Sequence, residues 1–284
     1  MNHFVGLKYR KSFNLGDYIQ SIAVERFLPK INCRLDRDTL ATLSGKKKRL
    51  LVTNGWFSHT PEMCFPFSHT VIPLFYGLHI TNWNNSWSHF LKPESIEYLN
   101  TYAPVGCRDR YTAKVLENHG VQTFYSKCLS LTLPRRKTQY RKDCYMIVDA
   151  EHISLPGFIK DKSIYLTHMY MDKRSESDAF GLARQLLQYY MEKATVIITS
   201  RLHCALPCLA MGIPVIFFNN PSDYRVSLLE DIGIKINAVN SQRDTDFWTS
   251  AIQQINFDRI EKNKSEITDD FTKRLDVWTH GIIT

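Results

Sequence analysis

The feature of this sequence that most constrains its fold is the alternation of short apolar runs rich in β-forming residues with segments of helical periodicity. The predicted strands include 50–53, 73–80, 144–148, 164–167, 194–199 and 215–218, and the predicted helices include 14–27, 111–119, 180–193 and a helix from about Leu202. Such alternation is typical of βαβ units that build a mainly parallel sheet. The sequence therefore predicts an α/β fold.

The length of 284 residues is enough for one large or two medium domains. The best boundary is the segment 131–142, which contains Pro134 and five basic residues between two apolar patterns. No internal sequence repeat is detectable, but both halves follow the same alternating plan. We therefore expect an N-terminal domain over residues 1–135 and a C-terminal domain over 140–284, the latter closed by terminal helices.

The composition, 44% hydrophobic and 23% charged, is that of a soluble globular protein. The formal charge of +8 suits anionic small molecules, nucleic acid or an acidic membrane surface. Much of the excess is local, at 46–49, 135–137 and 141–142, where solvated loops are the favoured interpretation and attraction to a membrane surface is the alternative. Aromatic residues do not interleave with these basic runs, so nucleic-acid binding is not expected.

Cysteine usage and the N-terminus both predict a cytoplasmic protein. The seven cysteines are odd in number and lie in apolar contexts, unlike a disulfide framework. No signal peptide is evident at the N-terminus, and no apolar run reaches the roughly 18 residues that span a bilayer. Peripheral contact with the inner face of the membrane stays open because of the basic runs.

A metal site is not expected. The sequence has no paired Cys/His spacing typical of zinc and no acidic cluster suited to calcium or magnesium. Cys204 and Cys208 lie beside His203 at helical spacing, which could indicate ligands. Two small apolar residues on one buried helix face are the favoured interpretation.

The strongest candidate site is the segment Thr199–His203, between the β-branched run 194–198 and the apolar segment 204–211. A strand ends there and a helix begins, with Arg201 and His203 at the junction. Cations at that position oppose the helix dipole, whose positive end disfavours them by about 0.3–1 kcal/mol. Helix-start N–H groups combined with an arginine and a histidine are typical of an anion-binding site.

The first half repeats this pattern at Cys107–Arg110, where a strand is followed at once by basic residues and a helix. In open α/β sheets, ligands bind outside the carboxyl ends of strands, so two facing halves would bring Arg108 and Arg201 to one cleft. Arginine has a fixed charge and a planar fork, so such a pair suits a carboxylate and a phosphate together. The alternative is that Arg108 pairs with Asp109 or another carboxylate.

A third candidate is the loop Asn14–Asp17, which opens the first predicted helix. Gly16 allows a tight turn and close approach of another backbone. Asp17 either caps the helix or acts as a base, and in isolation capping is the favoured interpretation.

In combination these motifs resemble the polysaccharide pyruvyl transferases. The motifs are Asn14-x-Gly16-Asp17-x-x-Gln20, Gly106-Cys107-Arg108-Asp109, and Ser200-Arg201-Leu202-His203 followed by Met211-Gly212-Ile213-Pro214. They occur in the family's order along the chain. The resemblance implies two Rossmann-like domains in a GT-B-like arrangement. It also implies transfer of pyruvate from phosphoenolpyruvate onto sugar hydroxyls as a ketal, during synthesis of a cell-surface polysaccharide such as an exopolysaccharide.

The donor residues follow from the same resemblance. Carried over by position, the Arg-Leu-His motif places Arg201, Leu202 and His203 on phosphoenolpyruvate, and Arg108 becomes a second anion clamp. His203 is the expected proton donor or phosphate contact, since the reaction needs an acid and a base of near-neutral pKa. Phosphoenolpyruvate is a co-substrate, so no cofactor and no metal is expected.

The acceptor side is less defined. The loop residues Asn14, Gly16 and Asp17 are assigned to it, and Asp17 and His168, which lies at a predicted strand end, are the candidate bases for the acceptor hydroxyl. The acceptor itself is a sugar, a nucleotide sugar or a lipid-linked glycan.

Two other functions fit the same architecture. A GT-B glycosyltransferase with a nucleotide-sugar donor needs an acidic residue for the donor ribose, and Glu230 and Asp231 are the obvious options in the second half. A binding protein without catalysis would recognise an anionic glycan or a lipid head group.

Overall fold

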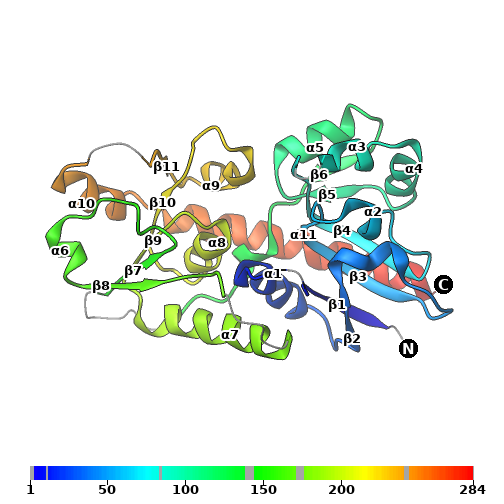
Figure 1. The fold of residues 1–284 in the computed structure, drawn as a ribbon, viewed down its shortest axis with the longest axis horizontal. Helices are drawn as coiled ribbons and strands as arrows, with labels where there is room; N and C mark the ends of the chain where they lie inside the picture. The colour runs from blue at the N-terminus through cyan, green and yellow to red at the C-terminus, as the bar shows by residue number, and fades with distance from the viewer. Residues whose placement is uncertain are drawn as a thin grey trace. The chain divides into compact units, whose positions relative to one another are not determined.

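Two parallel sheets, each alternating with helices, make up the structure, a computed structural model that describes residues 3–10, 12–82, 85–137, 144–170, 176–239 and 243–283 (Figure 1). The predicted α/β class is confirmed. The chain divides into unit 1, Met1–Ser12, Gln20–Leu129 and Ile267–Thr284, and unit 2, Phe13–Ile19 and Ser130–Glu266. The division near residue 130 lies close to the predicted boundary, but each unit also takes a segment from the other half of the sequence. Residues 138–143 of the predicted linker lie outside the described residues.

Unit 1 contains a six-stranded sheet in the order β2-β1-β3-β4-β5-β6, in which all paired strands are parallel. Its strands are β1 Phe4–Lys8, β2 Cys33–Asp36, β3 Arg49–Trp56, β4 Val71–His79, β5 Val105–Cys107 and β6 Thr123–Tyr125. Its helices are η1 Arg37–Thr42, α2 Pro61–Cys64, α3 Ser86–Phe90, α4 Pro93–Thr101 and α5 Arg110–Glu117. Helices α1, Leu15–Glu25, and α11, Phe257–Ile283, have residues in both units, and η3, Leu129–Thr132, lies where the chain passes between them.

Unit 2 contains a five-stranded sheet in the order β11-β10-β9-β7-β8, also with parallel pairs. Its strands are β7 Tyr145–Val148, β8 Ser163–Leu166, β9 Val196–Thr199, β10 Val215–Phe218 and β11 Ile236–Asn237. Its helices are α6 Gly157–Lys160, α7 Glu176–Lys193, α8 Leu202–Ala210, η4 Tyr224–Val226, α9 Leu228–Asp231 and α10 Thr245–Gln253.

Both sheets change winding direction at a defined point. In unit 1 the chain passes from β1 to β2 on one side and then crosses to β3 on the other. In unit 2 it passes from β7 to β8 and then crosses to β9. The carboxyl ends of the strands that flank such a switch point are the usual ligand-binding position in an open α/β sheet. The switch points therefore lie between β1 and β3 and between β7 and β9.

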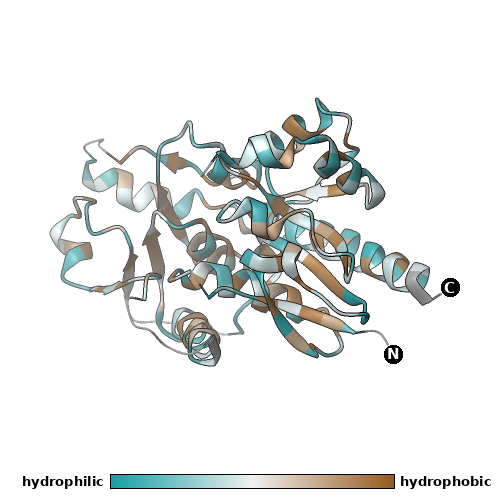
Figure 2. Cartoon of the chain, turned by 45° about the vertical axis from the view of Figure 1, so that its right-hand side comes forward, coloured by the Kyte–Doolittle hydropathy of each residue, from teal (hydrophilic) through white to brown (hydrophobic). Residues whose placement is uncertain are grey.

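The strands carry most of the apolar core. Figure 2 shows hydrophobic residues concentrated in the strands, while the helices mix hydrophobic and hydrophilic positions. In unit 2 one cluster of buried residues contains Ile147, Ala150, Ile153, Ile159, Val196, Ile198, Ile216, Phe218 and Trp248. Each large apolar side chain of this kind stabilises the fold by about 1.5–3 kcal/mol when fully buried. The cluster packs residues of β7, β9 and β10 against the loop after β7, α6 and α10, so it fixes the strands that lead to the switch point.

One strand of unit 1 is longer than the sequence predicts. Asn54-Gly55 looks like a strand end, yet β3 continues to Trp56, with a shift of register against β4 between Thr53 and Gly55. Gly77 allows the irregularity, because it has a φ of +79° and a Cβ there would lie 2.2 Å from the Asn54 Oδ1 atom. The carboxyl edge of this sheet is therefore formed by Trp56 and the residues that follow it.

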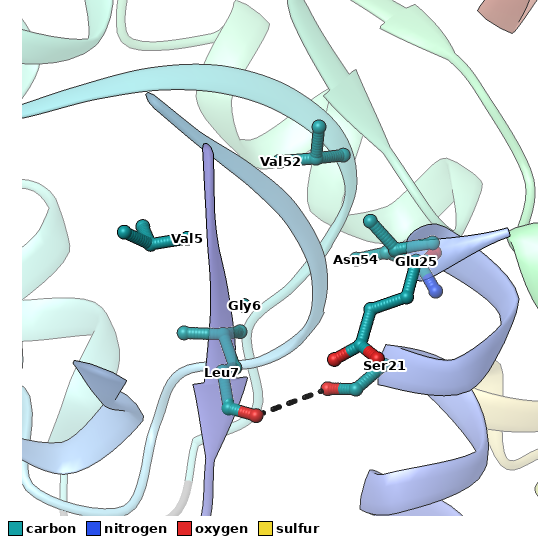
Figure 3. Close-up of a pocket in the computed structure, with 8 residues that line it drawn as sticks. Val5, Gly6, Leu7, Ser21, Glu25, Val52 and Asn54 are labelled. Carbon is teal, nitrogen blue, oxygen red and sulfur yellow. Dashed lines mark hydrogen bonds between the residues drawn. The ribbon is translucent and has the colours of Figure 1, made fainter. Parts of the chain in front are cut away.

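A small cavity in unit 1 is lined by residues of β1, α1 and β3 (Figure 3). The Ser21 hydroxyl donates a 3.5 Å hydrogen bond to the Leu7 carbonyl beside it, and the lining residues of the cavity are Val5, Gly6, Leu7, Ser21, Val24, Glu25, Val52 and Asn54. Its volume of about 10 Å³ is that of a single water molecule. This cavity is too small for a substrate.

Candidate functional site

The switch point of unit 2 is occupied by an ion pair. Asp149 follows β7 directly, and Ser200 and Arg201 follow β9. The Arg201 Nε atom donates to Asp149 Oδ2 at 2.9 Å. The Ser200 hydroxyl donates to the Asp149 backbone carbonyl at 2.7 Å. The two strand ends are thus tied together by both the side chain and the backbone of Asp149.

The Asp149 carboxylate is held from a third strand end as well. Its Oδ1 accepts the Thr167 hydroxyl at 2.5 Å, and its Oδ2 accepts the His168 backbone N–H at 3.0 Å, both just after β8. Asp149 has a φ of +49°, a left-handed conformation that is uncommon outside glycine and is often found at functional sites. The carboxylate therefore has a fixed position from which it orients the Arg201 guanidinium.

Arg201 combines this anchor with access to solvent. It occupies the N-cap position of α8, but its side chain does not cap the helix. Its backbone N–H donates to the Thr199 hydroxyl at 3.0 Å, and its side chain is 36% exposed. Asp149 engages only Nε, whereas a guanidinium has four further N–H donors on its two terminal nitrogens. The arrangement suits binding of a carboxylate or phosphate.

Helix α8 begins at Leu202, as predicted, and is almost wholly buried apart from its first turn. Leu202 is only 9% exposed, so it packs inward, while His203 is half-buried. Pro207 lies inside the helix and has no N–H to donate to the carbonyl of His203, four residues earlier. The first turn of α8 thus presents Arg201 and His203 on a rigid apolar support.

The predicted acceptor loop lies beside this turn within unit 2. Asn14 Oδ1 accepts the Gly16 N–H at 3.0 Å, and the Leu15 N–H donates to the His168 carbonyl at 2.8 Å. A Cβ on Gly16 would lie 3.0 Å from the Cβ of His203. Glycine is therefore required for the close approach of α1 to α8, which brings together two motifs that are far apart in the sequence.

The two candidate bases are both interior. Asp17 is 5% exposed. His168 is fully buried, and its Nε2 lies 3.0 Å from the Tyr190 hydroxyl, so its backbone rather than its imidazole contributes to the Asp149 network. Their roles in deprotonating an acceptor remain predictions.

Buried polar side chains of Cys204, Cys208, His168 and Tyr190 lie on the interior side of α8. Cys204 and Cys208 are both 0% exposed, which agrees with the interpretation of a buried helix face. Burial opposes ionisation of the Cys204 thiol, but hydrogen bonds from Cys208, His168 and Tyr190 outweigh it and lower its pKa. Burial, together with interactions with Cys204, raises the pKa of the Cys208 thiol and the Tyr190 hydroxyl. Without access to solvent, this cluster is structural.

In unit 1 the predicted clamp residue Arg108 follows β5 and is only 4% exposed. Its neighbour Asp109 pairs with His79, whose Nδ1 lies 2.6 Å from Asp109 Oδ2. Asp109 is also the N-cap of α5, where Oδ1 accepts the Thr112 N–H at 2.8 Å. Burial opposes the charge of Asp109, but the hydrogen bond and charge of His79, with Arg108, hold its pKa below the ordinary value. This strand end is buried, and the role of Arg108 as a clamp remains a prediction.

Sequence reasoning missed Asp149, Thr167 and Asn219. Each follows a strand directly, and the Asn219 Nδ2 donates to the Ser200 carbonyl at 3.5 Å. A polar residue at the end of a predicted strand is the signal that identified Arg201, and it was present for Asp149 after the run 145–148. The acidic residues of the glycosyltransferase alternative, Glu230 and Asp231, end the short helix α9.

The described part of the chain has neither a metal-ligand cluster nor a membrane-spanning helix. No group of three or more His, Cys, Asp or Glu residues there is arranged to hold a metal ion. No helix among the same residues has the length and apolar character needed to cross a membrane.

Comparison with known proteins gives the family. The family model for polysaccharide pyruvyl transferase matches residues 14–222, more than half of the chain. Among solved structures, a functionally uncharacterized protein from Klebsiella pneumoniae is similar, with a TM-score of 0.52 and 16% sequence identity over 84% of this chain and 93% of that one. At that identity the similarity concerns the fold alone. No curated protein matches the chain.

Proposed function

Because the chain belongs to the polysaccharide pyruvyl transferase family, we propose that it transfers pyruvate from phosphoenolpyruvate to two hydroxyls of a sugar. The product is a ketal on a cell-surface polysaccharide, such as an exopolysaccharide, or on its precursor. The observation that carries the proposal is the Asp149–Arg201 pair at the switch point of unit 2, next to the start of α8.

The donor site consists of Arg201 and the first turn of α8. Phosphoenolpyruvate carries a carboxylate and a phosphate, and a guanidinium fixed through Nε by Asp149 can bind either with its terminal nitrogens. Backbone N–H groups at a helix start favour the second anion. The near-complete burial of Arg108 argues against a direct contact with the donor, so the proposal assigns the donor to unit 2 alone.

The reaction needs one proton donor and one proton acceptor. A proton added to C3 of phosphoenolpyruvate makes C2 electrophilic, and the first sugar oxygen bonds to C2. The second sugar oxygen then bonds to C2 as the C2–O bond to phosphate breaks. The electron pair of that broken bond leaves with the phosphate. The two hydroxyls release two protons. One replaces the proton that C3 takes up when the methyl group forms, and the other is carried away by the phosphate, which leaves as hydrogen phosphate.

His203 is the residue to which we assign the donation at C3. It lies one residue into α8, beside Arg201, and is half-buried, so it can meet a bound anion without full loss of solvent. The dipole of the helix start lowers the pKa of a histidine, and a bound phosphate raises it. The opposing effects suit a general acid near neutral pH.

The wider setting follows from the family. We propose a GT-B-like arrangement of two Rossmann-like domains and a sugar, nucleotide-sugar or lipid-linked glycan as the acceptor. The seven free cysteines support a cytoplasmic location. The basic run 46–49 offers a place for peripheral contact with an acidic membrane surface.

The direct test is to incubate the purified protein with phosphoenolpyruvate and a panel of acceptor glycosides, and to measure phosphate release. We expect release that depends on both substrates, and a rise in melting temperature with phosphoenolpyruvate alone. Stabilisation by a nucleoside diphosphate, with none by phosphoenolpyruvate and no phosphate release, would instead identify a nucleotide-sugar glycosyltransferase.

A further inference from the structure

One surface pocket of unit 2 plays no part in binding the donor. It lies between α7 and the segment that follows β8, and its volume is about 590 Å³. Small-molecule sites in proteins typically measure about 300–1,000 Å³. Leu182, Gln185, Leu186 and Tyr189 come from α7, so we call this the α7 pocket. All of its lining residues belong to unit 2.

The wall that α7 contributes is separate from the face by which this helix packs into the core. The core face is made of Ala179, Ala183, Leu187 and Tyr190, which are all at most 6% exposed. Leu182, Leu186 and Tyr189 each precede a residue of that face by one position, so they lie about 100° round the helix from it. These three large side chains are only half-buried. The core of unit 2 therefore leaves apolar surface on this wall of the pocket.

The rest of the apolar wall comes from Leu15, Met169 and Tyr170, which backbone pairing holds in place. Met169 forms an antiparallel bridge with Asn14. The Tyr170 hydroxyl donates to the Tyr18 hydroxyl at 3.0 Å, which fixes the outer end of that side chain. Leu15 belongs to the loop that the sequence assigns to the acceptor. The pocket is thus preformed, and it adjoins that loop.

The pocket also adjoins the proposed donor site, through Thr167. This residue lines the pocket, and its hydroxyl donates to Asp149 Oδ1 at 2.5 Å. The other oxygen of the same carboxylate accepts from Arg201 Nε at 2.9 Å. The edge of the pocket is therefore two hydrogen bonds away from the guanidinium that we assign to the donor. A reaction between two substrates requires them to be held next to each other in this way.

The lining indicates a neutral occupant. None of the described residues that line the pocket is charged. A nucleotide sugar or a lipid diphosphate carries several negative charges, which proteins bind with arginine, lysine or helix starts. A saccharide is neutral, and it presents C–H groups on its ring faces and hydroxyls at its edge. Apolar side chains suit the first, and the exposed Thr167 and Gln185 suit the second.

We propose that the α7 pocket binds the acceptor as a neutral saccharide, with Tyr189 as the surface on which a sugar ring packs and Gln185 as a hydrogen-bonding partner of its hydroxyls. In a pocket of this kind apolar contact supplies much of the affinity, while a few polar groups fix the orientation of the ligand. The inference rests on the proposed function, which requires a sugar beside the donor. It selects a saccharide over a nucleotide sugar or a lipid-linked glycan.

A binding experiment tests the pocket without turnover. Saturation-transfer NMR uses cellobiose, lactose and mannobiose as neutral probes, with UDP-glucose and octyl glucoside as charged and apolar probes. We expect transfer to at least one disaccharide, reduced several-fold in Tyr189→Leu. The matched control is Tyr165→Leu, which changes a tyrosine of β8 that is 47% exposed and lies outside the pocket lining, and it should bind as the wild type does.

Three results of this experiment would overturn the proposal. The first is no transfer to any disaccharide. The second is equal transfer to the disaccharides in the wild type and in folded Tyr189→Leu. The third is transfer that depends on Tyr189 only for the uridine of UDP-glucose or for the octyl chain, because the pocket would then bind a nucleotide or a lipid.

A kinetic experiment separates the pocket from the proposed function. It uses the same three disaccharides as acceptors and measures phosphate release from phosphoenolpyruvate. We expect Tyr189→Leu to raise the KM of the acceptor several-fold with the KM of phosphoenolpyruvate unchanged, and Gln185→Leu to act in the same direction. A wild-type acceptor KM in folded Tyr189→Leu would overturn the pocket and leave the proposed function intact. Disaccharide binding that depends on Tyr189, with no phosphate release, would overturn the proposed function and with it the acceptor role, while saccharide binding stands.

Discussion

The two sheet edges use the same kinds of residue in opposite ways. At the edge of unit 2, Arg201 is 36% exposed and its carboxylate partner Asp149 is 13% exposed. At the edge of unit 1, Arg37 and Arg108 are 1% and 4% exposed. The histidines do not divide in this way. In unit 2 the imidazole of His168 is fully buried and His203 is half-buried, and in unit 1 His79 is 2% exposed and His59 is 30% exposed.

This contrast shows that the exposure of a charged side chain, more than its residue type, distinguishes residues that can bind a substrate from residues that stabilise the fold. An arginine anchored through one nitrogen and open at the others can bind an anion, whereas a buried arginine stabilises the fold or orients a neighbour. We therefore propose that the anionic donor binds at the exposed Arg201 of unit 2. The predictions below test that assignment.

The largest expected effect concerns a structural residue of unit 1. Asp109→Ala removes the partner of buried His79 and the N-cap of α5. Loss of one partner of a buried pair costs about 3–5 kcal/mol, so the free energy of unfolding should fall by that order in urea denaturation. A loss below about 1 kcal/mol would show that the pair is not structural.

The same pair predicts a pH dependence. The pKa of Asp109 is held below its ordinary value of 3.8, so its ionised form stabilises the fold. That contribution is fully present above the ordinary value and is lost as the pH falls through the lower folded value. The difference in unfolding free energy between wild type and Asp109→Asn should therefore shrink on acidification below about pH 4. A constant difference would contradict the direction of the shift.

His203→Gln should cause the largest loss of activity. Removal of the proton donor should lower ketal formation by about 10²-fold or more, with the fold and phosphoenolpyruvate binding preserved. Steady-state kinetics and calorimetric titration separate the two effects. Loss of donor binding with normal turnover at saturation would make His203 a phosphate contact only.

Arg201→Lys should have a smaller effect, because the charge remains and only the fork is lost. We expect turnover to fall at least about tenfold, or about 1.4 kcal/mol. Asp149→Asn should act in the same direction, since it weakens the contact at Nε that orients the guanidinium. Wild-type kinetics in both variants would remove the anion clamp from unit 2.

The smallest expected effect is that of Gly16→Ala. Its new methyl group would lie 3.0 Å from the Cβ of His203, so α1 or α8 must shift by a few tenths of an ångström. We expect a loss of stability of about 1 kcal/mol and a fall in turnover of a few-fold. The exposed Gly120, which has no atom within 4 Å of such a Cβ, is unsuitable as a control because its φ is +81°, whereas Gly181 has open space and no such restriction. Gly181→Ala should leave turnover unchanged and should not lower stability, because Gly181 lies inside helix α7, where alanine is the better helix former.

Much of the fold was predictable because strong periodicity and strand composition decide element type. The strand Val215–Phe218 and the helix start at Leu202 agree with the sequence prediction. The strand Phe4–Lys8 was missed, since it is short and lies at the N-terminus without a turn signal. The assignment of Phe13–Ile19 to unit 2 and Ile267–Thr284 to unit 1 depends on long-range packing, which sequence spacing does not encode.

The site was predictable only in part. Arg201 and His203 were identified from the sequence because cations are unexpected at the start of a helix. The sequence did not show that other residues in a similar position are buried. Arg108 follows a strand as Arg201 does, yet it is buried. The edge of the unit 1 sheet was placed too early, because Asn54-Gly55 looks like a strand end whereas β3 continues to Trp56.

The most direct test of the central claim is calorimetric titration of phosphoenolpyruvate into the wild type, Arg201→Gln and His59→Gln. Loss of a charge-assisted hydrogen bond of about 1.5–3 kcal/mol should weaken binding by roughly 10- to 100-fold in Arg201→Gln. His59→Gln should bind as the wild type does if the donor binds at Arg201 of unit 2, as proposed. Unchanged affinity in Arg201→Gln together with weakened affinity in His59→Gln would contradict the account, since the anion would then bind at the edge of unit 1.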